Sequence, residues 1–196
     1  MKYEDRLILF LDFLGFKNYI TSHKESDIIE LYKSISNIFA INEEYWEVFR
    51  SKKVSQFSDC LTISYNIKKD PEAVSLMIES VQRTHIELIR NQVLVRGAIK
   101  IGQLYHGGFK LRDEKKSKYN IIFGDAIVKA YEVESTTAIY PRTVVGNEVI
   151  EFIKKTNLKK FKRMYNKEKL LESIKKDFDG YSYVDYIDNP ITILND

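Results

Sequence analysis

A short apolar run near the start of the chain, LILFLD (7–12), constrains the fold more than any other segment. Leucine, isoleucine or phenylalanine fills five of its six positions, and the sixth is Asp12. Such a run is typical of a buried strand, and buried strands rarely carry an unpaired charge. Either Asp12 therefore lies where the strand emerges from the core, or a positive group meets it.

Length and composition indicate one globular domain spanning residues 1–196. The 196 residues are 44% hydrophobic and 30% charged, which is typical of a chain that folds around one sizeable core. No apolar run approaches the ~20 residues of a membrane helix, and the opening MKYEDR is unlike a secretory signal, so we expect a cytoplasmic protein. Cys60 is the single cysteine, which excludes an internal disulfide and a cysteine-rich zinc site.

Hydrophobic periodicity predicts the elements along the chain. Helical spacing predicts helices over 27–41, 70–90, 125–135 and 147–155. Apolar or alternating runs predict strands over 7–11, 53–65 (as two strands), 93–101, 121–123, 138–145 (interrupted by Pro141) and, as an edge strand, 181–187. The polar stretch 106–120 is predicted to be a loop or a long hairpin arm.

The order of these elements predicts the fold class. A β-α-β-β-α-β order followed by further α and β pieces is typical of an α+β protein with a ferredoxin-like antiparallel sheet and helices on one face. Within 53–65 the two strands meet at a tight turn around Ser58 and Asp59, which places Asp59 at a hairpin tip.

Asp12 and Asp59 are the candidate metal ligands. They lie 59 − 12 = 47 residues apart, and in a ferredoxin-like sheet the first strand and this hairpin are neighbours. Two carboxylates brought together repel unless a cation lies between them, and oxygen ligands suit Mg²⁺ or Mn²⁺. The alternative involves no metal: Asp12 caps the following helix, and Asp59 is an ordinary turn residue.

Four segments extend the argument: FLDFLGF (10–16), FSDCLTIS (57–64), VRGAIKIGQLYHGG (95–108) and IIFGDAIVKAYEVES (121–135). In order and approximate spacing they resemble the signature segments of class III nucleotidyl cyclases. The resemblance covers residues 7–135 and leaves 136–196 as a C-terminal α/β completion of the domain.

The resemblance implies roles for six residues. Asp12 and Asp59 match the metal-binding aspartates, and the carbonyl of Phe13 matches a backbone ligand. The amides of Leu14, Gly15 and Phe16 match the turn that holds the triphosphate, as helix-start N–H groups can. The implied reaction is attack of the ribose 3′-oxygen on the α-phosphate of a nucleoside triphosphate, with two divalent cations, Mg²⁺ or Mn²⁺. The implied assembly is a homodimer with composite active sites.

The chain departs from the family at the transition-state donors. Val128 stands where the family has asparagine, and Glu132 where it has arginine, so neither usual donor to the reacting phosphate is present. Four cations are candidates to substitute for them, of which Arg142 is the first to test because Pro141 would rigidify it: Arg142, Arg96, Lys100 and Lys129.

The base-selecting positions depart as well. The chain has Ser55 and Ile121 where purine cyclases have their Lys/Asp or Glu/Cys pairs, so a purine edge would not be bound in the usual way. Length and base pocket resemble the small stand-alone bacterial pyrimidine cyclases of antiphage defence (the Pycsar type). This resemblance implies UTP rather than CTP as substrate.

Two other functions stay open on the sequence. A degenerate cyclase fold would bind nucleotide without turnover, and Val128 and Glu132 are the features that favour it. The segment 154–176, with ten Lys/Arg against two Glu, could bind nucleic acid, although a solvated helix face explains it more simply. His106 lies beside two glycines where it could contact a phosphate or a metal, but a histidine in such a loop usually has no function, and we assign it none.

Overall fold

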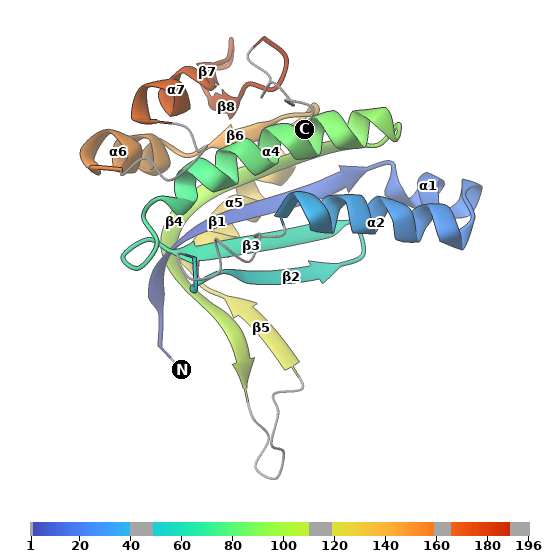
Figure 1. Cartoon of the computed structure of the whole chain (residues 1–196), viewed down its shortest axis with the longest axis horizontal. Helices are drawn as coiled ribbons and strands as arrows, with labels where there is room; N and C mark the ends of the chain where they lie inside the picture. The colour runs from blue at the N-terminus through green and yellow to red at the C-terminus, as the bar shows by residue number, and fades with distance from the viewer. Residues whose placement is uncertain (1, 40–48, 110–118, 159–165, 189–196) are drawn as a thin grey trace.

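The computed structural model describes residues 2–39, 49–109, 119–158 and 166–188 of the chain (Figure 1). Its strands are β1 (Glu4–Leu14), β2 (Lys53–Phe57), β3 (Cys60–Asn66), β4 (Leu94–Phe109), β5 (Tyr119–Phe123), β6 (Thr143–Val145), β7 (Ile174–Lys176) and β8 (Ser182–Val184). They form one sheet in the order β2-β3-β1-β4-β6-β8-β7, with β5 paired to β4. Only the β4–β6 pairing is parallel among the described strands.

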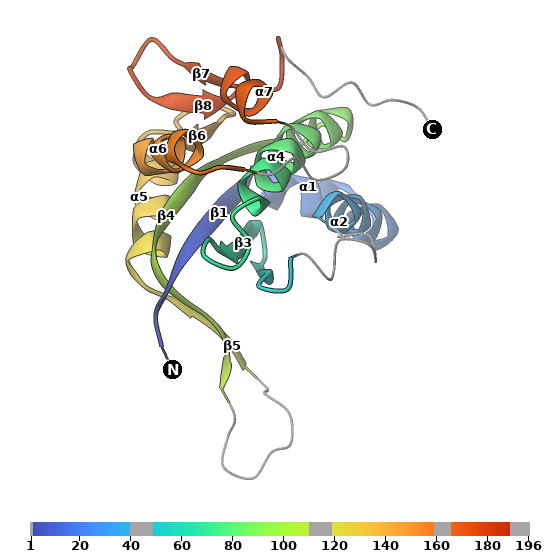
Figure 2. The same ribbon diagram turned by 60° about the vertical axis from the view of Figure 1, so that its left-hand side comes forward.

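Helices cover both faces of this sheet (Figure 2). The described helices are α1 (Phe16–Ser22), α2 (Glu25–Phe39), α4 (Ala73–Arg90), α5 (Asp125–Thr136), α6 (Asn147–Lys155) and α7 (Lys167–Glu172). In Figure 2, α2 and α4 lie on one side of the strands and α5 on the other. The prediction of helices on one face only is therefore wrong.

Each face of β1 belongs to a different core, which explains why its sequence is a continuous apolar run. Leu7, Leu9 and Leu11 point toward α2 and α4 in the larger core. Ile8 and Phe10 point the other way and pack with Ala126 and Ala130 of α5. Because alternate residues of a strand face opposite sides, a strand between two helical layers must be apolar at every position. The small alanines let α5 lie close to the sheet.

The long strand β4 bends out of the sheet to form an arm with β5. Its first half pairs with β1, from Leu94 opposite Leu14 to Leu104 opposite Glu4. Its second half pairs with β5, from Tyr105 opposite Phe123 to Phe109 opposite Tyr119, and the arm extends away from the body in Figure 2. The hairpin arm predicted over 106–120 is thus confirmed at both of its described ends, while 110–118 lie outside the described residues.

Most predicted elements are confirmed, and two differ. The largely antiparallel α+β sheet is as predicted, and α6 has the predicted bounds 147–155. The strand predicted over 138–145 is limited to Thr143–Val145, since Pro141 has no N–H for a ladder. The edge strand predicted over 181–187 is β8, which is not at the edge because β7 pairs outside it. No helix in the described part of the chain is long and apolar enough to cross a membrane.

Candidate functional site

Asp12 and Asp59 come together at one end of the sheet, as the sequence predicts. Asp12 is near the end of β1, paired with Cys60, the first residue of β3. The β2–β3 hairpin closes between Phe57 and Cys60, which leaves Ser58 and Asp59 as its two-residue turn. The Phe13 amide donates a 3.0 Å hydrogen bond to the Asp59 carbonyl and ties the turn to β1. Ligand atoms of Asp12, Asp59 and Cys60 all lie within 4.8 Å of one another.

The hairpin tip is held from the other side by α2. Ser58 has a left-handed backbone, with φ at 52°, as tight hairpin turns require. The Tyr32 hydroxyl of α2 donates a 2.8 Å hydrogen bond to the Ser58 carbonyl. Burial and the nearby Asp59 raise the pKa of Tyr32, so the phenol remains a donor at neutral pH. The turn that carries Asp59 is therefore held by two hydrogen bonds to its backbone, one from β1 to the Asp59 carbonyl and one from α2 to the Ser58 carbonyl.

The donors that converge here fit a hard divalent cation. The Asp12 and Asp59 side chains are partly exposed, so their carboxylate oxygens are accessible to an ion. The Cys60 thiol donates toward Asp12 at 3.8 Å, and burial together with the neighbouring carboxylates raises its pKa to about 11. The two carboxylates supply hard oxygen donors, which are typical of Mg²⁺ or Mn²⁺ sites.

Arg96 is the cation that meets Asp12. Its Nε lies 3.3 Å from the Asp12 carboxylate and 2.5 Å from that of Glu134. Glu134 is 2% exposed, and burial raises its pKa although Arg96 lowers it. Both alternatives for the opening strand are therefore observed: Asp12 lies where β1 emerges, and a positive group meets it. Of the four cations predicted to replace the missing donors, Arg96 alone contacts Asp12 within the described structure.

Arg142 lies in a different environment. It is 1% exposed, donates to Asp177 at 2.5 Å and to the Thr137 carbonyl at 2.7 Å, and also pairs with Asp179. Its guanidinium stacks 4.3 Å from the ring of Tyr140. These contacts join the β7–β8 turn to the end of α5, and none of them reaches Asp12 or Asp59. The geometry gives Arg142 a structural role, and its catalytic role stays a prediction.

The outer side of α5 carries the positions where the chain departs from the cyclase pattern. Val128 is 54% exposed, and Glu132 is exposed one turn further along. Lys129 is exposed too and pairs with Asp125 at 2.8 Å. Lys100, beneath α5 in β4, lies 3.7 Å from Glu148. None of these side chains contacts the carboxylate pair of its own chain in the described structure.

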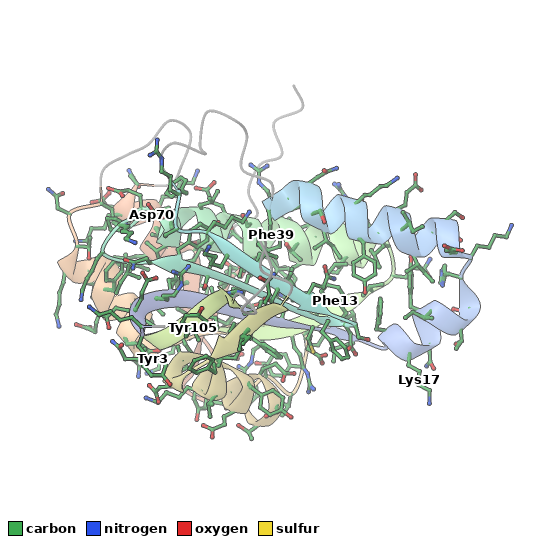
Figure 3. The ribbon with its side chains drawn as sticks, turned by 90° about the horizontal axis from the view of Figure 1, so that it is seen from below. Tyr3, Phe13, Lys17, Phe39, Asp70 and Tyr105 are labelled. Carbon is green, nitrogen blue, oxygen red and sulfur yellow. The ribbon has the colours of Figure 1, made fainter. Side chains whose placement is uncertain are left out.

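The turn after β1 begins α1. Gly15 has a left-handed φ of 74°, and its carbonyl accepts the amides of Asn18 and Tyr19. Phe16 is buried against Phe13 and fixes the turn to the core, whereas open space surrounds Gly15. Figure 3 shows Phe13 at this end of the sheet, with Lys17 of α1 beyond it. The predicted triphosphate segment, Leu14 to Phe16, thus directly follows the metal candidate Asp12.

A pocket of about 490 Å³ adjoins the carboxylates through their neighbour Cys60. Ser55, predicted for the base pocket, lines it together with Asn120 and Ile122 of β5. Ile121, the other predicted residue, is not among the lining residues, because alternate residues of β5 point to opposite sides. The ten described residues that line it include no charged one: Phe10, Val54, Ser55, Gln56, Phe57, Cys60, Thr62, Asn120, Ile122 and Ile127.

Sequence reasoning missed a buried polar network behind this pocket. His106 of β4 lies 2.8 Å from Ser55 through Nε2 and 2.8 Å from Ser64 through Nδ1. Arg6 of β1 donates from Nε to the Ser64 hydroxyl at 3.0 Å. The available signal was the run of polar residues at alternate positions of β3, since polar side chains on a buried face need partners.

The basic segment 154–176 is described except for 159–165. Lys154 and Lys155 both pair with Glu151 on the surface of α6, at 3.5 and 3.3 Å. Lys175 and Lys176 belong to β7. The described part is thus split between three elements rather than forming one helix face.

Comparison with solved structures identifies the fold. The adenylyl cyclase CyaB from P. aeruginosa is 18% identical with a TM-score of 0.56, and the match covers 96% of this chain and 97% of that one. The monomeric guanylyl cyclase domain of the RhoGC fusion protein from Blastocladiella emersonii is 16% identical at 0.60, covering 93% and 95%. The guanylate cyclase domain of RhGC from Catenaria anguillulae, in complex with GTP, is 17% identical at 0.58, covering 79% and 85%.

These neighbours are catalytic domains of class III cyclases, and the likeness is one of fold. No protein-family model matches the chain, and no curated protein resembles it in sequence. The predicted cyclase-type α+β fold is confirmed by these structures.

Proposed function

We propose that this chain is a metal-dependent nucleotidyl cyclase, which converts a nucleoside triphosphate to its 3′,5′-cyclic monophosphate and pyrophosphate. One observation carries the proposal: Asp12 and Asp59, from segments 47 residues apart, converge within 4.8 Å at the end of β1. Arg96 already pairs with Asp12, and a divalent cation between the two carboxylates would further offset their repulsion. We extend the proposal to the whole chain, 1–196, as a single catalytic domain.

In this proposal Asp12 and Asp59, with the Phe13 carbonyl, hold two divalent cations, Mg²⁺ or Mn²⁺. When bound, the cations supply positive charge that favours ionisation of the ribose 3′-hydroxyl and offsets charge on the leaving pyrophosphate. The 3′-oxygen forms a bond to the α-phosphorus, and the bond from that phosphorus to the pyrophosphate oxygen breaks.

The chain's own backbone positions the triphosphate. Amides of Leu14, Gly15 and Phe16 donate to phosphate oxygens, and the left-handed Gly15 turns them toward the site without a side chain in the way. This role is supported by the open space around Gly15 and by the burial of Phe16, which keeps the turn rigid.

For the base we propose a pyrimidine, with UTP preferred over CTP, as in an antiphage second-messenger cyclase of the Pycsar type. The support is the pocket lined by Ser55 and Asn120, whose lining residues include no charged group that could pair with a purine edge. Ile121 is retained as a pocket candidate from the neighbouring chain or from a shift of β5.

We further propose a homodimer with composite sites. Large apolar side chains are exposed on the faces that flank the pocket: Phe57 is 85% exposed, Tyr131 57% and Val128 54%. Exposed apolar side chains that gather beside one pocket are typical of an interaction surface. Lys129, exposed beside Val128, is then the cation best placed to reach a second chain. Light scattering after size exclusion should give twice the chain mass of 23.1 kDa.

A second candidate is a nucleotide-binding module without turnover. Val128 and Glu132 favour it, because an apolar group and an anion replace the donors that would stabilise the reacting phosphate. The two functions differ in product formation and agree in metal-dependent binding.

The test is product identification. Purified protein is incubated separately with ATP, GTP, UTP and CTP in Mn²⁺ or Mg²⁺, and the products are analysed by mass spectrometry. Asp12→Asn and Asp59→Asn should abolish the product, while Asp27→Asn, an exposed aspartate of α2, is the matched control and should preserve it. Metal-dependent binding with no product from any triphosphate would replace the cyclase with the binding module.

A further inference from the structure

A chain of four polar side chains runs from the interior of the sheet to the pocket. It begins at Arg6, passes through Ser64 and His106, and ends at Ser55, with steps of 3.0, 2.8 and 2.8 Å. The first three side chains are buried, at 2%, 0% and 7% exposed, and Ser55 lines the pocket. The residues come from four different strands, β1, β3, β4 and β2.

The arginine end is fixed. The Arg6 guanidinium also donates to the Ser64 carbonyl at 3.0 Å, to Glu4 at 2.6 Å and to the Ser51 carbonyl. A guanidinium carries donors only and stays protonated. Its Nε–H must therefore donate to the Ser64 hydroxyl oxygen, which acts as an acceptor at this step.

The direction of the remaining bonds follows. Among the described residues, the acceptor within reach of the Ser64 hydroxyl proton is Nδ1 of His106. A neutral imidazole has one donor and one acceptor nitrogen, so Nε2 carries the hydrogen and donates to Ser55. Burial, Arg6 and Lys53 lower the pKa of His106 to about 4, so the ring is neutral at physiological pH.

Of these four side chains, Ser55 is the one that lines the pocket. Its oxygen accepts from His106, and His106 is its hydrogen-bond partner within the described structure. The Ser55 hydroxyl hydrogen is thus free to donate to a pocket occupant. The Ser55 oxygen keeps one lone pair, but every hydrogen bond of this network runs outward from the Arg6 cation, and such cooperative polarisation makes the Ser55 O–H a stronger donor and its oxygen a weaker acceptor.

We propose that His106 is a positioning residue, which with Ser64 and Arg6 holds Ser55 as a hydrogen-bond donor that selects a carbonyl on the base of the bound nucleotide. Uracil presents its O4 carbonyl where cytosine presents an amino group, so the stronger donor at Ser55 favours uracil over cytosine. This inference rests on the proposed function for its ligand class. The same donor would favour guanine, which has a carbonyl at the corresponding position, over adenine, which has an amino group there.

Binding of two non-reacting probes tests the inference separately from turnover. 3′-Deoxy-UTP and 3′-deoxy-CTP lack the attacking hydroxyl, and their affinities are measured by titration calorimetry in the presence of Mn²⁺. For the wild type we expect 3′-deoxy-UTP to bind about fivefold more tightly, the ratio that a difference of about 1 kcal/mol in one hydrogen bond gives.

Variants separate positioning from general packing. Ser55→Ala, Ser64→Ala and His106→Leu should bring the ratio of the two affinities to within about twofold of one. His106→Gln, whose amide can still donate to Ser55, should keep the wild-type ratio. The matched control is Ser173→Ala, a fully buried serine bonded to the Leu170 carbonyl outside the pocket, and it should also keep the ratio. If Ser64→Ala fails to fold, the affinity ratios of Ser55→Ala and the two His106 variants are sufficient to test the inference.

The outcomes distinguish this inference from the proposed function. A ratio that collapses as described, with no cyclic product from any triphosphate, supports the inference and overturns the cyclase. Cyclic product together with equal affinities, a preference for 3′-deoxy-CTP, or a ratio unchanged in all three disrupting variants overturns the inference and leaves the cyclase. Absence of binding by both probes overturns the inference and the pyrimidine preference, whereas cyclic product from ATP or GTP would still leave the cyclase.

Discussion

Gly15 occupies a left-handed backbone conformation at the step from β1 to α1, with φ at 74°. A side chain there has room but strains the backbone. We expect Gly15→Ala to lower the free energy of unfolding by about 1 kcal/mol, measured by urea denaturation, and to weaken triphosphate binding.

Gly107→Ala is the control for this substitution. Gly107 lies in β4 without a positive φ, and an added Cβ would make only ordinary contact with Tyr105 at 3.6 Å. No loss of stability is expected for it. Equal losses in both variants would show that the conformation of Gly15 has no special cost.

The carboxylate pair was predictable from the sequence, and the surroundings of the pair were not. Asp12 ends an apolar strand and Asp59 sits in a recognisable two-residue turn, so local patterns placed each of them. The ion pair of Arg142 was not predictable, because its partner Asp177 follows 35 residues later, in a segment whose short strands carry little periodic signal. His106 gave no signal, since Ser55 and Ser64 reach it only after three strands pair.

At the scale of elements, α2 helps to fix the position of the hairpin turn that carries Asp59. Its contact with the tip is the hydrogen bond from Tyr32 to the Ser58 carbonyl. We expect Tyr32→Phe to cost about 0.5–1 kcal/mol of stability and to weaken Mn²⁺ binding several-fold, since the turn is then held by β1 alone. Titration of the protein with Mn²⁺, followed by electron paramagnetic resonance, measures the second effect.

Tyr19→Phe is the matched control. Tyr19 stacks on His23 and Phe16, and its hydroxyl has no hydrogen-bond partner within the described residues. Its variant should bind Mn²⁺ like the wild type. If Tyr32→Phe does so too, the helix contact does not position Asp59.

Element prediction succeeded where one face or one period dominated. The amphipathic α6 and the doubly buried β1 were predicted well. In α6 the apolar pattern repeats with every helical turn, and in β1 the residues on both faces are apolar. Element prediction missed β7 and predicted β8 as too long, because so short a strand of three residues is defined by its neighbours rather than by its own sequence.

For the whole molecule, two buried histidines make stability depend on pH. Burial lowers the pKa of His85 to about 3, and burial with Arg6 and Lys53 lowers that of His106 to about 4, from 6.5. Below pH 6.5 the unfolded chain therefore binds protons that the folded chain does not. The free energy of unfolding should fall with decreasing pH by up to about 1.4 kcal/mol per pH unit for each histidine.

Urea denaturation at pH 7, 6 and 5 measures this slope. The raised pKa of Glu134 acts in the opposite sense, because its folded form binds the proton more readily. Comparison with His85→Gln isolates one histidine, and this variant should show a clearly smaller slope. Identical slopes in the two proteins would mean that His85 is protonated in the folded state.

The placement of both aspartates in one chain predicts how inactive variants combine. In a homodimer with composite sites, Asp12 and Asp59 of the same chain serve the same site. Mixing Asp12→Ala with Asp59→Ala should therefore restore no cyclase activity, assayed with the triphosphate that the wild type converts. Recovered activity would indicate that the two carboxylates act at different sites.

The position of Cys60 has a practical consequence. It is the only cysteine of the chain, and it lies between the carboxylate pair and the pocket. The raised pKa of Cys60 makes its alkylation slow at neutral pH, so a thiol-directed label applied at alkaline pH attaches beside both the carboxylates and the pocket, without any engineered residue. The rate at which this thiol is alkylated, with and without Mn²⁺ or nucleotide, then reports occupancy of both halves of the site in the native sequence.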